Sequence, residues 1–193
     1  MSKQNYTVVK SFLHRDLCKI AEQYCLFQML NNFSPDTENG QVPGTHSVYS
    51  DSLMESLLLY AKPNMEEVVG LKLIPTYSYY RVYRPGDILK EHTDRFACQI
   101  SATITLGYKY NNSGDDYKWR LYGYVNNEKK YIDSDVGDAI VYKGCDLVHG
   151  RDVFDADKDS YHVQVFLHYV NAEEPNIDQY VYDGRPGIGY IKK

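Results

Sequence analysis

Hydrophobic residues recur at helical spacing in the first third of the chain. Over residues 17–30, leucine, isoleucine, alanine and tyrosine return every three or four positions, with lysine, glutamate and glutamine between them. This pattern predicts an amphipathic helix, and Asp16 stands where an N-cap is expected. Residues 31–50 are polar and rich in glycine and proline, so they are predicted to form a loop.

Two shorter helices are predicted before residue 75. Ser52 and Glu55 have the spacing of a capping box in front of the apolar run at residues 53–61. Pro63 is typical of the first position of a helix and is predicted to begin the second one. The first third of the chain is therefore predicted to be mainly helical.

The pattern changes after residue 75, where runs rich in tyrosine, valine, isoleucine and threonine alternate with turn residues. Such runs predict β-strands. The predicted strands are residues 75–83, 88–94, 99–108, 119–125, 139–142 and 161–170. No segment between them is long enough for repeated β–α–β crossovers. The pattern therefore predicts an antiparallel sandwich or barrel with helices packed on one side.

The composition narrows the class of protein. A chain of 193 residues with a net charge of -5 fits one domain and has no basic field to hold a nucleic-acid backbone. No apolar stretch approaches the roughly 18 residues of a membrane span. The four cysteines form no Cys-x-x-Cys pair, which favours a reduced, cytoplasmic protein. We therefore expect a monomer or homodimer that binds neither nucleic acid nor membranes.

Candidate metal ligands lie at the end of one predicted strand and beyond a later turn. Side chains two residues apart in an extended chain point the same way, so His92 and Asp94 can reach one ion. His149 follows the predicted strand at residues 139–142 and would supply a third ligand. Two histidines and one carboxylate leave open positions on Fe(II) for a co-substrate and oxygen. These residues predict an iron centre.

Residues 76–170 resemble the Fe(II)/2-oxoglutarate-dependent dioxygenases, particularly the prolyl-4-hydroxylase-like branch. One motif is the run at residues 79–94, which contains a Pro-Gly turn and the His-x-Asp motif. The others are the predicted strand at residues 101–106 and the Gly137-Asp138 turn that leads to His149.

The resemblance implies a mostly β protein with N-terminal helices. Its core would be a double-stranded β-helix (jelly-roll, cupin-like) that is supported by helices on the major sheet. The chain would form a single dioxygenase domain over residues 1–193. Within it, residues 1–74 would be mainly helical support, residues 75–170 the β-helix core and residues 171–193 a C-terminal arm.

The resemblance also implies roles for individual residues. His92, Asp94 and His149 would hold the iron and form the catalytic centre. Tyr83 stands before the Pro-Gly turn, where such enzymes often hold 2-oxoglutarate. Thr105 lies on the strand that commonly contributes a second hydroxyl to the distal carboxylate.

The anchor for that carboxylate departs from the family pattern. The family usually places arginine or lysine after the distal histidine, on the final strand, and the nearest match in spacing is Lys158 in an acidic stretch. Arg151 lies two residues beyond His149 and could form a bidentate fork. We expect Arg151 to be the anchor, supported by His162 and Gln164; Lys158 and His162 are the alternatives.

The implied activity is that of an oxygenase that uses Fe(II), 2-oxoglutarate and O2, with ascorbate as an additional reductant. Such an enzyme hydroxylates a side chain of a protein or peptide, with proline among the candidates, or a small amino-acid-like molecule. It converts 2-oxoglutarate to succinate and CO2. Two alternatives remain open: a non-catalytic cupin-like β-sandwich that binds a ligand, and a cupin-like metal enzyme that does not use 2-oxoglutarate.

Overall fold

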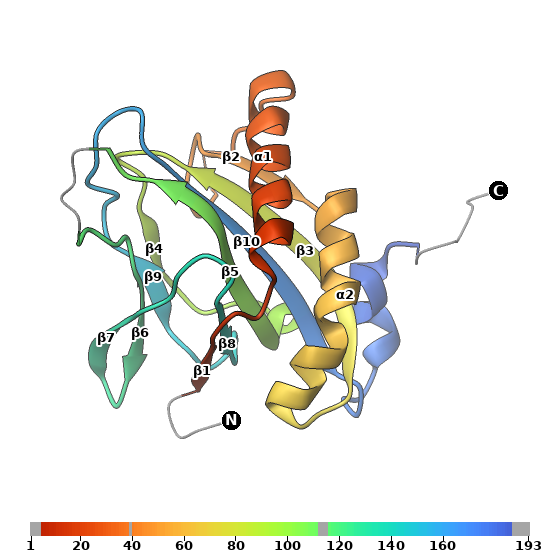
Figure 1. The fold of residues 1–193 in the computed structure, drawn as a ribbon. Coiled ribbons are helices and arrows are strands. Elements are labelled where there is room, and N and C mark those ends of the chain that lie inside the picture. Colours follow the sequence, from red (N-terminus) through yellow and green to blue (C-terminus); the bar gives the residue numbers. More distant parts are fainter. Residues whose placement is uncertain (1–4, 39, 112–115, 187–193) are drawn as a thin grey trace.

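The computed structural model describes residues 5–38, 40–111 and 116–186, which form two antiparallel sheets and a layer of helices (Figure 1). The major sheet has the strand order β1 (Tyr6–Val9), β8 (Ala139–Tyr142), β5 (Ile100–Lys109), β10 (Tyr161–Asn171), β3 (Leu73–Tyr83) and β2 (His46–Tyr49). The minor sheet has the order β4 (Leu89–His92), β9 (His149–Arg151), β6 (Leu121–Val125) and β7 (Glu128–Ile132). Strands far apart in sequence are neighbours in both sheets, as in a jelly roll. The predicted double-stranded β-helix is confirmed.

Two helices, α1 (Arg15–Asn31) and α2 (Ser52–Val69), cover the outer face of the major sheet (Figure 1). The prediction that Asp16 caps α1 is wrong. His14 has the extended backbone of an N-cap, and its Nδ1 accepts a hydrogen bond from the Asp16 amide at 3.3 Å. Asp16 lies in the first turn, where its charge faces the positive end of the helix dipole.

The predicted capping box of α2 does not form either. The N-cap is Asp51, whose carboxylate accepts from the amides of Leu53 at 2.9 Å and Met54 at 3.2 Å. The Glu55 carboxylate turns toward the sheet and accepts from the Ser78 amide at 2.7 Å. Glu55 therefore ties the helix to β3, a long-range contact that the local pattern does not show.

Pro63 lies inside α2, so the prediction that it begins a new helix is wrong. A proline in a helix interior removes one backbone hydrogen bond. Ala61 and Met65, on either side of Pro63, are fully buried against the sheet, and this packing holds the helix continuous. The helix ends at Gly70, which has the left-handed backbone (φ 70°) typical of a C-cap.

Strand β3 separates two hydrophobic cores because its side chains alternate. Tyr80 and Val82 pack with the helices, whereas Tyr79 and Tyr83 face the space between the two sheets. Arg81 lies between Tyr79 and Tyr83 in this alternation, and it is 3% exposed. The alternation thus places a charged side chain inside the barrel.

Three short strands were not predicted from the sequence: β2, β7 and β9. β7 is mostly exposed and carries charged residues, so it has no hydrophobic run. β9 has only three residues, and β2 lies in the segment that was predicted to be a loop. Each forms because it pairs with a neighbouring strand, which is a long-range effect.

The C-terminal part of the described chain packs beside β3. A 3-10 segment, η2 (Ile177–Gly184), contacts this strand, and Asp183 accepts two hydrogen bonds from Arg95 at 2.9 and 2.7 Å. The remainder of the predicted arm, residues 187–193, lies outside the described residues. Neither α1 nor α2, nor any other helix in the described ranges, has the length and apolar character needed to span a membrane.

Candidate metal centre and buried arginine sites

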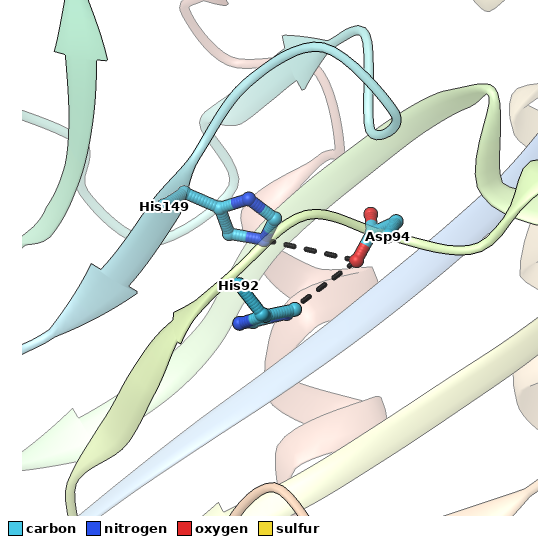
Figure 2. Close-up of side chains that lie close together, drawn as sticks. All are labelled: His92, Asp94 and His149. Carbon is cyan, nitrogen blue, oxygen red and sulfur yellow. Dashed lines mark ion pairs between the residues drawn. The ribbon is translucent and has the colours of Figure 1, made fainter. Parts of the chain in front are cut away.

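Two histidines and one aspartate come together where β4 and β9 meet (Figure 2). His92 and His149 are partners in the pairing of these strands, and Asp94 follows β4. Asp94 Oδ1 lies 3.5 Å from His92 Nε2 and 3.9 Å from His149 Nε2. One ligand atom from each residue lies within 4.8 Å of the other two. Three donors that converge in this way fit a single metal ion.

Backbone carbonyl groups orient both imidazole rings. His92 Nδ1 donates to the Lys90 carbonyl at 2.8 Å, and His149 Nδ1 donates to the Leu147 carbonyl at 2.9 Å. A carbonyl oxygen only accepts, so Nδ1 carries the proton in each neutral ring. The Nε2 lone pairs therefore face Asp94, which is the tautomer that binds a metal through Nε2.

The same surroundings set the protonation states of the ligands. Burial lowers the pKa of His149, so its ring is neutral. Burial acts to raise the pKa of Asp94, but its interactions with His92, His168 and His149 outweigh burial and hold this pKa below its ordinary value. A charged carboxylate and a neutral imidazole are the forms that bind a divalent cation.

Side chains that sequence reasoning missed support the second oxygen of Asp94. Ser101 Oγ lies 3.4 Å from Asp94 Oδ2 and 2.8 Å from His168 Nδ1. Cys98 and His168 also form a group with Asp94 whose ligand atoms lie within 4.8 Å. Burial raises the pKa of Cys98 to about 12, so its sulfur keeps its proton and lies 2.9 Å from the Tyr77 hydroxyl. The group of His92, Asp94 and His149 is therefore the better metal site.

A cavity of about 400 Å³ opens beside the cluster. Besides the three candidate ligands, aromatic side chains from β3 and β10 and a loop before β2 contribute to its lining: Tyr77, Tyr79, Phe166, Asp36, Gly40 and Gln41. The guanidinium of Arg81 lines the same cavity. Its centre lies 4.9 Å from the Tyr79 ring and 5.9 Å from the Phe166 ring. The candidate metal centre therefore shares its cavity with aromatic surface and one buried cation.

Arg81 is held by one carboxylate. Its Nη2 lies 3.2 Å from Asp36 Oδ2, while its Nε has no hydrogen-bond partner. Burial acts to lower the pKa of Arg81, but the nearby Tyr83 and Tyr79 phenols and Asp36 outweigh burial and raise this pKa. Sequence reasoning missed Arg81 because the inward face of β3 depends on which side the helices cover.

The five residues predicted to bind 2-oxoglutarate lie together in the interior and are called the donor chamber below: Tyr83, Thr105, Arg151, His162 and Gln164. Gln164 Oε1 accepts hydrogen bonds from three of them. Arg151 Nη2 donates at 3.2 Å, His162 Nε2 at 2.7 Å and Thr105 Oγ1 at 3.1 Å. Three donors thus share one acceptor oxygen, so the chamber has more hydrogen-bond donors than acceptors at this point and can donate to a ligand oxygen.

Arg151 has no acidic partner among the residues that the structure describes. It is 1% exposed, it donates through Nη1 to the Trp119 carbonyl, and its guanidinium centre lies 4.7 Å from the Trp119 ring. Its Nε and the hydroxyl of Tyr83 both lack a hydrogen-bond partner. Burial lowers the pKa of Arg151. A buried cation beside a donor hydroxyl is a site that favours an anion.

The alternative anchor Lys158 lies elsewhere. It is exposed on the turn before β10. His162, the other alternative, is buried in the donor chamber, where its Nδ1 accepts from the Tyr110 hydroxyl at 2.7 Å. Burial and the charge of Arg151 hold the pKa of His162 well below its ordinary value. His162 is therefore neutral, and Arg151 supplies the positive charge of the chamber.

No protein-family model matches the sequence, and no curated protein matches it. Solved structures do match. A prolyl-4-hydroxylase from Pseudomonas putida has a TM-score of 0.64 and 14% identity, over 87% of this chain and 94% of that chain. The α-ketoglutarate-dependent epimerase SnoN from nogalamycin biosynthesis has a TM-score of 0.71 and 12% identity, over 88% of this chain and 79% of that chain.

A third match is the viral collagen prolyl hydroxylase from Paramecium Bursaria Chlorella virus-1, solved as a 2-oxoglutarate complex. It has a TM-score of 0.57 and 12% identity, over 86% of this chain and 96% of that chain. At such identities the likeness establishes the fold. The chain has a double-stranded β-helix fold that is shared with prolyl hydroxylases and with a non-heme α-ketoglutarate-dependent epimerase.

Proposed function

We propose that this protein is an Fe(II)- and 2-oxoglutarate-dependent oxygenase. The observation that carries the proposal is the presence of two complementary sites in one barrel. His92, Asp94 and His149 offer a divalent metal a face of two imidazoles and one carboxylate. The donor chamber offers an anion a buried arginine that has no counter-ion among the described residues. A dicarboxylate that chelates a metal would use both sites.

The spacing of the two sites also supports 2-oxoglutarate. His149 and Arg151 lie on β9 two residues apart, so their side chains point the same way from positions about 6.6 Å apart along the strand. This separation is comparable with the length of a five-carbon dicarboxylate. The distal carboxylate would accept hydrogen bonds from Arg151 Nε and the Tyr83 hydroxyl, with Thr105 beside them. His162 and Gln164 would position the guanidinium.

When bound, Fe(II) supplies the redox chemistry that couples oxygen to the decarboxylation of 2-oxoglutarate into succinate and CO2. The residues of this chain would bind the ion and the co-substrate and orient them. Nε2 of His92, Nε2 of His149 and the carboxylate of Asp94 would hold the ion. In both rings the Nδ1–H group donates a hydrogen bond to a backbone carbonyl oxygen. Arg151 would offset the charge of the co-substrate.

The proposed reaction is hydroxylation, with ascorbate as an auxiliary reductant. The substrate would be a side chain of a protein or peptide, with proline among the candidates, or a small amino-acid-like molecule. The likeness to two prolyl hydroxylases supports hydroxylation. The epimerase of the same fold shows that the scaffold also serves a different reaction.

Anaerobic spectroscopy tests the proposal. Fe(II) and 2-oxoglutarate added to the full chain should produce a visible metal-to-ligand charge-transfer band, and succinate, which lacks the keto group, should not. In air, 2-oxoglutarate should be converted to succinate. Absence of the band and of turnover would contradict the proposal. A band without turnover in air would favour the binding module, and metal binding without any response to 2-oxoglutarate would favour a different cupin-like metal enzyme.

A further inference from the structure

The cavity beside the candidate metal centre contains a second arginine that the proposed binding of metal and co-substrate does not use. Along the inner faces of β3 and β10, His168 pairs with Tyr77, Phe166 with Tyr79, and Gln164 with Arg81. The pair formed by Tyr77 and His168 lies beside Asp94. Arg81 therefore lies two cross-strand pairs further along the cavity wall from the metal centre, beyond the aromatic pair of Tyr79 and Phe166.

Arg81 has hydrogen-bond donors to spare. A guanidinium carries five N–H donors, and Asp36 accepts from Nη2 at a long distance of 3.2 Å. Nε has no partner, although the residue is 3% exposed and lines the cavity. A buried donor without a partner costs free energy unless a ligand satisfies it. The arrangement fits a ligand oxygen in the cavity.

Asp36 holds Arg81 without saturating it. The Asp36 carboxylate also accepts from the amides of Thr37 at 3.0 Å and Val42 at 3.1 Å, so its charge is shared with the turn that it closes. Gly40 packs directly on this carboxylate, since a Cβ at position 40 would lie 2.2 Å from Asp36 Oδ1. Asp36 therefore belongs to a loop that lines the cavity, and its carboxylate holds the Arg81 guanidinium there.

We propose that Arg81 binds the carboxylate of a small carboxylic-acid substrate, of which a free amino acid is the model. The proposal rests on the proposed function and names its substrate class. Arg81 would fix the carboxylate, the body of the substrate would lie against Tyr79 and Phe166, and the far end would reach the metal centre. A cavity of about 400 Å³ falls within the range for ligand pockets, so a small acid fits it.

Direct binding to the metal-free full chain tests this assignment without relying on oxygenase activity. The probes are the twenty free L-amino acids, each compared with its C-terminal amide, and binding is measured by ligand-observed NMR followed by calorimetry. At least one free acid should bind at least ten times more tightly than its amide. Arg81→Met should abolish that preference, and Arg81→Lys, which keeps the charge but not the planar fork, should weaken it. The matched control is Arg120→Met, which removes an exposed arginine paired with Asp133.

The outcomes separate this inference from the proposed function. Equal binding of acid and amide, binding that survives Arg81→Met, or no binding of any free acid would overturn the role of Arg81, whether or not the charge-transfer band forms. A tenfold or greater rise in the 2-oxoglutarate requirement of Arg81→Met would also overturn it, because Arg81 would then hold the co-substrate. If Arg81→Met does not fold, Arg81→Lys and the acid–amide comparison on the unaltered chain still decide the question.

Discussion

The interior of the barrel contains two buried arginines whose surroundings differ. Arg81 on β3 of the major sheet has an acidic partner, Asp36, and faces the cavity. Arg151 on β9 of the minor sheet contacts a carbonyl, an amide oxygen and an indole ring, and no carboxylate among the described residues. Burial outweighs the other influences on the pKa of Arg151 but not on that of Arg81.

The difference shows which arginine needs a ligand to be stable. A buried cation that has its own carboxylate is stable before any ligand binds, and it can add selectivity with its remaining donors. A buried cation without a carboxylate is costly until an anion arrives. Arg151 is therefore the better candidate for an obligatory co-substrate, and Arg81 for the molecule that is transformed.

The largest effect on the charge-transfer band is expected from a substitution at the metal centre. The co-substrate bound by Arg151 would also coordinate the ion, so the band requires the metal. Asp94→Ala should abolish the charge-transfer band with Fe(II) and 2-oxoglutarate, since it removes the only carboxylate of the cluster. Circular dichroism should show an intact fold. Asp146→Ala, at an exposed aspartate, is the control and should keep the band. Retention of the full band by Asp94→Ala would show that the metal binds elsewhere.

Arg151→Met should raise the 2-oxoglutarate concentration needed for half-maximal band formation by about 100-fold, which corresponds to ~2.7 kcal/mol. Without ligand, its melting temperature should be unchanged or higher, because the variant removes an uncompensated buried charge. Titration of the band and differential scanning calorimetry measure the two quantities. Lys158→Leu is the matched control at an exposed position. If Lys158→Leu gives the 100-fold effect instead, the anchor has been misassigned.

Arg81→Met should have the opposite effect on stability. It leaves the Asp36 side chain, which is 13% exposed, without its cation, and the loss should be about 2–4 kcal/mol of unfolding free energy. Urea denaturation measures this value. Adding Asp36→Asn to Arg81→Met should recover part of the loss, because the unpaired charge is removed. Equal stability changes in Arg81→Met and Arg151→Met would abolish the distinction between the two arginines.

The smallest effect concerns the neighbour of Arg151. Burial and the charge of Arg151 hold the pKa of His162 well below its ordinary value, whereas an unfolded histidine titrates near pH 6.5. Below about pH 6.5 the unfolded chain binds one more proton than the folded chain at this residue, so stability falls as the pH falls. The contribution of His162 is about 1.4 kcal/mol per pH unit.

Urea denaturation at pH 7 and at pH 5.5 measures this contribution. The loss of stability over this interval should be smaller in His162→Gln than in the unaltered chain. His14→Asn, which replaces an exposed histidine and preserves an N-cap side chain, should keep the full loss. An unchanged loss in His162→Gln would show that His162 is not kept neutral by its surroundings.

Local sequence patterns predicted the strands that carry His92, Tyr83 and Gln164, because these strands have strong β patterns, and they placed Asp94 two residues beyond His92. The same patterns did not predict Arg81, Ser101 or His168 as part of the site. Their roles depend on the register of β3, β5 and β10 and on which face the helices cover. Both are long-range properties of the fold.

The errors in the helical part have one origin at the N-caps, where the competing residues are local, and another at Pro63, where packing decides. His14 and Asp51 are the true N-caps, although Asp16 and Ser52 are better matches to a local rule. Packing of α2 against the sheet overrides the breaking tendency of Pro63. Where tertiary contacts outweigh local preference, a single sequence does not contain enough information to place an element.

The placement of the two arginines on different sheets also has an evolutionary consequence. Tyr83 on β3 belongs to the donor chamber, whereas Arg81 and Asp36 do not. Under the proposed function, paired substitutions at Arg81 and Asp36 would change the choice of substrate while Arg151 and its hydrogen-bond partners stay the same. Descendants of this barrel would then acquire new substrates through two positions.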